Sequence, residues 1–112
     1  MNRVQLVGIV VWPVEVWNDR TTGRAFGRAM LAVSADEHPL AFVPVILQGS
    51  EAMDAAMYLG EGSRVEVTAH LHSSLVTNRD VSGSRRTRRV LHVIADSVKY
   101  LVVRTPQAGD RP

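Results

Sequence analysis

Residues 42–67 read FVPVILQGSEAMDAAMYLGEGSRVEV, and the spacing of the apolar residues changes twice along this stretch. In 42–48 the side chains alternate between two faces, which predicts a strand. From Ser50 to Leu59 the apolar residues recur every three or four positions, which predicts a helix capped by Ser50 and stopped by the glycines that follow. Strict alternation returns in 63–73, so the stretch predicts a strand, a helix and a second strand.

The flanking segments add further strands. Residues 3–11 are apolar on both faces, Pro13 interrupts them, and 14–17 are expected to continue the strand as an edge or bulged segment. Residues 24–34 alternate with period two, 74–86 read as a polar hairpin loop, and 89–103 form a long final strand that bends near 95–97.

The predicted order is therefore three strands, one helix and two strands. This order is typical of an all-β, five-stranded OB-fold barrel with its helix between strands 3 and 4. A partly open SH3-like barrel is the alternative, although it leaves the helix harder to place.

The length and composition limit the possibilities. The chain has 112 residues, of which 46% are apolar, and this predicts one domain over 1–103 followed by a disordered tail over 104–112. There is no cysteine and no apolar run long enough to cross a membrane, and the first residues do not resemble a signal peptide. These features favour the cytoplasm.

The positive charge is concentrated in one place. The net charge is only +2, but residues 79–89 contain five arginines and one aspartate, and twelve of the thirteen basic residues are arginine. Arginine suits phosphates and stacks on flat rings, so the cluster favours a nucleic acid as partner. A GC-rich genome would explain the number of arginines but not their position, and a solvated mobile loop is the other interpretation.

Four segments occur in a familiar order: MNRVQLVG, FVPVILQG, YLGEGSRVEV and RRVLHVIADSVKYL. Together they resemble the bacterial single-stranded DNA-binding proteins over about residues 1 to 102. The resemblance implies an OB fold, usually a homotetramer, that coats single-stranded DNA without sequence preference. The primosomal replication protein B is a similar relative; it has the same barrel, is dimeric and acts in replication restart.

Stacking aromatics are fewer than in that family. Phe42 stands at one usual aromatic position, whereas Gln48, Glu37 and Val76 stand at or near three others. Stacking is worth about 1–3 kcal/mol per base, so three losses would weaken binding by several kcal/mol unless the arginines compensate. The acidic tail that recruits replication proteins in the family has no counterpart in this sequence.

The candidate DNA-binding residues are the clustered arginines, three other arginines and three aromatics, although the two tryptophans could instead cap the barrel or fill an interface. They are Arg3, Arg28, Phe42, Arg64, Arg79, Arg85, Arg86, Arg88, Arg89, Trp12 and Trp17. We expect Tyr58, at the end of the helix, to lie in the core instead.

Other functions find less support in the sequence. His70, His72 and His92 suggest a zinc site, but no cysteine or carboxylate nearby completes one, so we expect no metal and no cofactor. No phosphate loop or nucleophile motif indicates an enzyme. The competing class is a protein-interaction module that docks a replication partner.

The first strand predicts self-association. Val4, Leu6 and Val10 alternate with Val7, Ile9 and Val11, and a single barrel can bury only one of these sets. We therefore expect a homo-oligomer with this strand in its interface, a tetramer by resemblance or a dimer otherwise.

Overall fold

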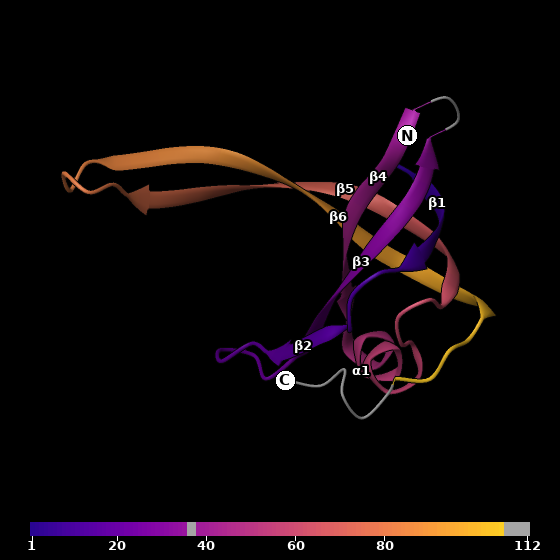
Figure 1. Ribbon diagram of the computed structural model, residues 1–112. Coiled ribbons are helices and arrows are strands. Elements are labelled where there is room, and N and C mark those ends of the chain that lie inside the picture. The colour runs from indigo at the N-terminus through magenta and orange to yellow at the C-terminus, as the bar shows by residue number, and fades with distance from the viewer. Residues whose placement is uncertain (36–37, 107–112) are drawn as a thin grey trace.

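The structure is a computed structural model that describes residues 1–35 and 38–106. It contains one helix and six strands (Figure 1). These elements are β1 (Val4–Val10), β2 (Glu15–Asn18), β3 (Ala25–Ala35), β4 (His38–Gln48), α1 (Gly49–Tyr58), β5 (Arg64–Arg79) and β6 (Arg85–Val102). In the part of the chain that is described, no helix is long and apolar enough to cross a membrane.

Five of the strands close into a ring. The sheet runs β1-β5-β6-β4-β3, and β1 also pairs with β3, which completes the circle. All of these pairings are antiparallel except that of β4 with β6. The predicted five-stranded OB-fold barrel is confirmed. The segment after Pro13 forms β2, which pairs only with β3, so α1 lies between the third and fourth strands of the ring.

The ring closes where β1 changes partners. Residues 4–9 of β1 pair with β5, and residues 8–10 pair with β3. At this crossing a Cβ on Gly8 would lie 2.9 Å from the carbonyl oxygen of Ala32, closer than packing allows. The absence of a side chain at Gly8 therefore lets the two strands meet.

The core follows the predicted alternation. Inward residues of the strands are buried together with one face of α1. The most deeply buried of them are Val10, Leu31, Val45, Leu47, Ala52, Ala55, Leu59, Val65, Val67 and Ala69. α1 packs closely on β3 because Gly27 has no side chain. A Cβ at that position would lie only 3.1 Å from the Cβ of Ala52.

Two predictions about the helix are wrong. Ser50 is not the N-cap, because α1 begins at Gly49, directly after β4, and Ser50 is already inside the helix. The N-cap is Gln48, and its side chain makes no capping hydrogen bond. Tyr58 is 48% exposed and not part of the core, because the buried face of α1 carries Ala52 and Ala55.

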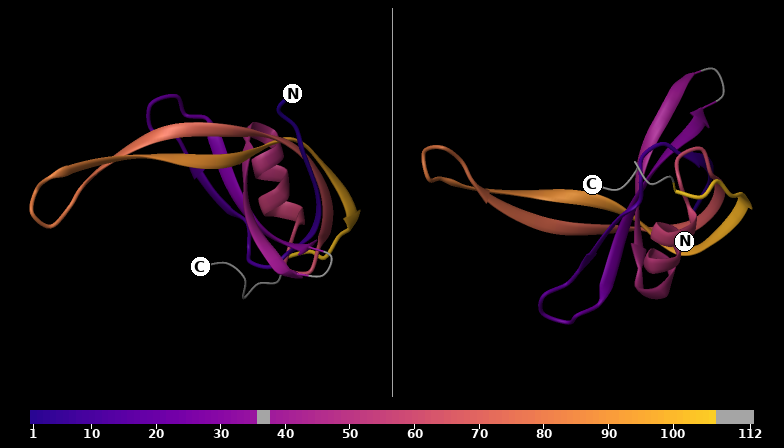
Figure 2. Two further views of the ribbon diagram at one scale, coloured as in Figure 1. Left: turned by 90° about the horizontal axis from the view of Figure 1, so that it is seen from above. Right: turned by 60° about the horizontal axis from the view of Figure 1, so that its bottom comes forward.

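The region predicted as a polar loop is mostly strand. β5 extends to Arg79, β6 begins at Arg85, and the two pair without interruption from Arg79 to Leu71. Polar side chains are compatible with this ribbon because both of its faces meet solvent. It projects from the ring as a long arm (Figures 1 and 2). The bend expected near 95–97 is confirmed by an irregularity in the pairing of β5 with β6. Thr68 is opposite Ser97, but the next residue, Ala69, is opposite Ala95, so Asp96 is an extra residue in β6.

The chain returns to the end of the helix after β6. The backbone N–H of Arg104 donates to Oγ of Ser63 at 2.9 Å, and that hydroxyl donates to the carbonyl oxygen of Arg104 at 3.0 Å. The N–H of Gly60 donates to the same carbonyl at 2.6 Å. These bonds fall in the first residue of the predicted tail, whereas 107–112 lie outside the described residues.

Candidate nucleic-acid interface

The outward side chains of β2, β3 and β4 form one continuous surface, which we call the outer strip. Its members are opposite one another in four rows across the strands. The rows are Trp17, Phe26 and Gln48; Glu15, Arg28 and Ile46; Met30 and Pro44; and Ala32 and Phe42. The neighbours of these residues along β3 and β4 point inward and fill the core. Because successive side chains of a strand point to opposite faces, the residues of the strip face solvent.

Aromatic rings lie at both ends of the outer strip. Phe42 is 62% exposed at one end, as its position in the alternating pattern predicts. At the other end the rings of Trp17 and Phe26 are stacked, with centroids 6.4 Å apart and planes inclined by 21°. The sequence pattern pointed to Trp17 but not to Phe26. Its position opposite Trp17 across a short hairpin was the signal available.

Trp12 is not part of these rows. It lies in the connection between β1 and β2 and is 56% exposed.

Gln48, which stands where the family usually has an aromatic residue, lies in the row of Trp17 and Phe26. Val76 lies on β5 opposite Arg88, and Glu37 falls outside the described residues.

Three arginines lie on the outer strip or beside it. The guanidinium of Arg28 is 3.6 Å from the carboxylate of Glu15, an exposed pair of little energetic weight. Arg20 and Arg24 are exposed in the turn between β2 and β3. Backbone hydrogen bonds between Asp19 and Gly23 and between Asp19 and Arg24 order this turn. Neither turn arginine was predicted as a site residue, because the two are not clustered with others along the chain.

The arginine cluster is divided between the two faces of the β5–β6 arm. Directly opposed residues share a face, so Arg86 and Arg88 lie with Asn78 and Val76. Arg85 and Arg89 lie on the other face with Arg79 and Leu75. The cluster therefore does not present all of its charges in one direction.

One of these faces continues the outer strip. β4 and β6 pair in parallel at Val45 with Val93 and at Ile46 with Ile94. Val45 is buried, whereas Ile46 belongs to the outer strip, so Ile94 lies on the strip's side of the sheet. Alternation along β6 then places Arg88 and Arg86 on that side.

A hydrogen-bonded turn ends the arm. The Oδ1 of Asp80 accepts hydrogen bonds from the backbone N–H groups of Ser82 and Ser84 and from the hydroxyl of Ser82. The hydrogen bond from the Ser82 hydroxyl, more than any other cause, holds the pKa of Asp80 below its usual value. Arg86 lies 3.7 Å from the other carboxylate oxygen. The turn thus keeps Arg79 and Arg85 paired at the tip.

Arg3 and Arg64 lie elsewhere on the ring. Arg3 precedes β1, and Arg64 begins β5 opposite Ile9 of β1 and Val102 of β6. This wall of the ring is formed by β1, β5 and β6, so the structure does not bring these two arginines to Phe42.

Two of the three histidines considered as zinc ligands form hydrogen bonds with neighbouring side chains, and the third lies opposite one of them. Nδ1 of His70 is 2.8 Å from Oδ1 of Asp96, Nε2 of His92 is 3.0 Å from Oγ of Ser74, and His72 is opposite His92. Within residues 1–35 and 38–106, no three side chains of the metal-binding types are arranged to hold an ion.

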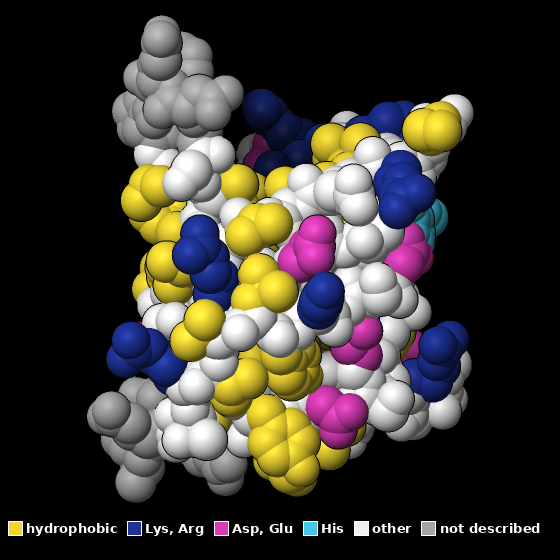
Figure 3. Space-filling model, turned by 90° about the vertical axis from the view of Figure 1, so that its right-hand side faces the viewer, with side chains coloured by type: hydrophobic (Ala, Val, Ile, Leu, Met, Phe, Trp, Pro, Cys, Tyr) yellow, Lys and Arg dark blue, Asp and Glu magenta, His cyan; other side chains and the backbone are white. Residues whose placement is uncertain are grey.

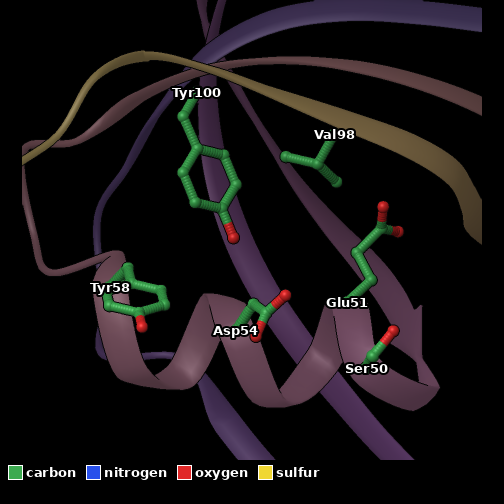
Figure 4. Close-up of a pocket in the computed structure, with 6 residues that line it drawn as sticks. All are labelled: Ser50, Glu51, Asp54, Tyr58, Val98 and Tyr100. Atoms are coloured by element: carbon green, nitrogen blue, oxygen red, sulfur yellow. The ribbon is translucent and has the colours of Figure 1, made fainter.

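The hollow between α1 and β6 is acidic. This cavity of about 420 Å³ is lined by Glu51, Asp54, Tyr58 and Tyr100, together with Ser50 and Val98 (Figure 4). Burial above all raises the pKa of Glu51 and that of Tyr100, and neighbouring carboxylates add to both effects. Negative charge repels phosphate, so a nucleic acid would avoid this side of the helix.

A second hollow lies on the other side of α1. It measures about 610 Å³ and is mainly apolar, with Met53 and Met57 from the helix and Val14 and Val16 from the β1–β2 region among its lining. Among the described residues that line it, Glu15 alone is charged. This hollow therefore does not offer the cations that phosphate binding requires.

The chemistry points to the outer strip: exposed rings, arginines at both hairpins, and a sheet face of the kind that binds oligonucleotides in OB folds. The sequence matches the single-strand binding protein family over residues 1–101. A search of the curated proteins found no match. Because the family match spans nearly the whole chain, the protein belongs to the single-strand binding protein family, whose members bind single-stranded DNA.

Proposed function

We propose that single-stranded DNA lies along the outer strip and continues onto the β5–β6 arm. Phe42 stacks on a base, Arg86 and Arg88 contact phosphates, and the arginines of the β2–β3 turn contact phosphates at the other end. The two hairpins project from the same side of the ring, so they flank this path (Figures 1 and 2).

The observation that carries this path is the pairing of β4 with β6. Ile46 and Ile94 are directly paired, so the strip that carries Phe42 runs without a step into the face that carries Arg88. A base-stacking surface and a phosphate-binding surface then form one track, as single-strand binders require.

Binding of this kind is independent of sequence, because phosphates are common to all sequences and every base has a π-face. We propose that the protein coats and protects single strands in the cytoplasm during replication, repair or recombination, and that it catalyses no reaction itself. Arg3 and Arg64 stay candidates for a strand that wraps around the ring.

We further propose that the protein is a homo-oligomer with β1 in its interface. Val7 and Ile9 are each 44% exposed on the outer face of β1. Figure 3 looks onto the side where β1, β5 and the end of β6 lie, and hydrophobic side chains are exposed there among charged ones. Leu101 and Val103 add to the exposed apolar surface at the end of β6. Exposed apolar side chains gathered on one face usually mark an interface.

The protein-docking interpretation and the primosomal relative have no specific support. The family match is to the single-strand binding family as a whole. The apolar hollow beside α1 does not by itself identify a protein that would fill it.

Titration of the protein with labelled oligothymidine of several lengths, at two salt concentrations, tests the proposed path. We expect binding that tightens with length until the track is filled and weakens as salt rises. A mixed-sequence strand should bind equally well, and duplex DNA of the same length should compete poorly. Equal binding of duplex and single strand would contradict the role of exposed rings.

A further inference from the structure

The end of the outer strip nearest the β2–β3 turn holds an unusual group of side chains. Trp17, Phe26 and Gln48 are directly opposite one another on three neighbouring strands. The two rings are nearly parallel, with centroids 6.4 Å apart, and Trp17 is 45% exposed. The two stacked rings thus present flat apolar surface that is partly exposed to solvent.

The amide beside these rings is available. Gln48 is partly exposed, so its amide can be reached from solvent. An amide offers a donor and an acceptor together and can rotate to match the edge of any base. A flat aromatic ligand with polar edges would therefore satisfy all three side chains.

Three arginines lie near the same group. Arg28 lies in the next row, where it pairs with Glu15 at 3.6 Å, and Arg20 and Arg24 are exposed in the turn that joins the strands of Trp17 and Phe26. A ligand that combines flat rings with negative charge fits this environment better than an apolar or cationic one.

We propose that Trp17, Phe26 and Gln48 form a second nucleobase-binding subsite, separate from that of Phe42. One base stacks on the ring pair, its edge faces Gln48, and the adjoining phosphates meet Arg20 and Arg24. Gln48 lies six positions beyond Phe42 along β4, or about 20 Å away, so the two subsites hold different bases. This inference rests on the proposed path of the DNA.

Tryptophan fluorescence tests the subsite directly. The chain has two tryptophans, so W12F leaves Trp17 as the only one while keeping a ring at position 12. In this background, oligothymidine should quench the emission of Trp17 along the same curve as the anisotropy of a labelled strand. Binding seen by anisotropy without any change in Trp17 emission would overturn the subsite and leave the proposed function intact. No binding by either signal would overturn both.

Matched variants separate stacking from packing. F26L keeps apolar volume without a ring and should weaken binding about 5- to 150-fold, the effect of removing one stacked ring, whereas F26Y should restore it. Q48A should weaken binding, and Q5A should not, because Gln5 is exposed on β1, which lies in the opposite wall of the ring from the outer strip. Equal affinity of F26L and F26Y, or equal effects of Q48A and Q5A, would also overturn the proposal. Circular dichroism would establish that each variant is folded.

Discussion

Phe42 is the residue on which the base-stacking interpretation depends most. It is 62% exposed on the outer strip, so Phe42→Ala removes little buried surface. We expect weaker oligothymidine binding by about 1–3 kcal/mol with little change in melting temperature. Anisotropy titration and thermal unfolding measure the two effects.

Its neighbour supplies the control. Val43 faces inward and packs against the core, so Val43→Ala should lower the melting temperature and leave binding per folded molecule unchanged. If Phe42→Ala instead unfolds more easily and binds as before, Phe42 is a structural residue.

Gly8 is the residue that permits ring closure. A Cβ there would meet the Ala32 carbonyl at 2.9 Å, and this oxygen belongs to backbone that cannot rotate away. We expect Gly8→Ala to destabilise the fold by about 1–3 kcal/mol, as overpacking does. Urea unfolding would measure this. Thr21→Ala, at an exposed position of the β2–β3 turn, should change stability by less than about 0.5 kcal/mol. Equal stabilities for the two variants would contradict the close approach.

The arm formed by β5 and β6 is the element that carries most of the charge. The sequence predicts up to four phosphate contacts from Arg85, Arg86, Arg88 and Arg89. The paired strands divide these arginines, and only Arg86 and Arg88 continue the outer strip. Charge clustered in sequence is thus distributed to opposite sides by the alternation of a strand.

Two double variants that remove the same amount of charge test this division. The slope of log affinity against log salt falls by about 0.7 for each phosphate that the protein no longer neutralises. Arg86→Ala with Arg88→Ala should flatten the slope by about 1.4 units, and Arg85→Ala with Arg89→Ala by less than about 0.7. Equal changes from both pairs would mean that DNA contacts both faces of the arm. Unchanged slopes would make the cluster a solvated surface and favour protein docking.

At the scale of the whole molecule, the exposed face of β1 predicts assembly. Light scattering at micromolar concentration should give the mass of a tetramer, by resemblance to the family, or of a dimer. Val7→Lys with Ile9→Lys should lower that mass by placing charge in the interface. Val81→Lys changes an exposed valine at the tip of the arm and should leave the mass unchanged. A monomeric parent protein would contradict the proposal.

Much of this molecule was predictable from the sequence because strands and helices leave local patterns. The alternation in 42–48 and 63–73 and the helical spacing after Ser50 predicted the order of elements and the buried residues Val45, Leu47, Val65 and Val67. The composition predicted one domain and a nucleic acid partner. Polarity, by contrast, was a poor guide to the arm, because a ribbon exposed on both faces needs no apolar pattern.

Only the tertiary structure decided which distant residues meet. The opposition of Trp17 to Phe26 and Gln48 depends on how β2, β3 and β4 align, and a shift of one residue would turn one of them to the other face. The same holds for Ile46 and Ile94, whose pairing selects two of the clustered arginines for the strip. The sequence by itself therefore determined the fold and the class of ligand, whereas strand register, which depends on long-range pairing, decided which side chains form the track.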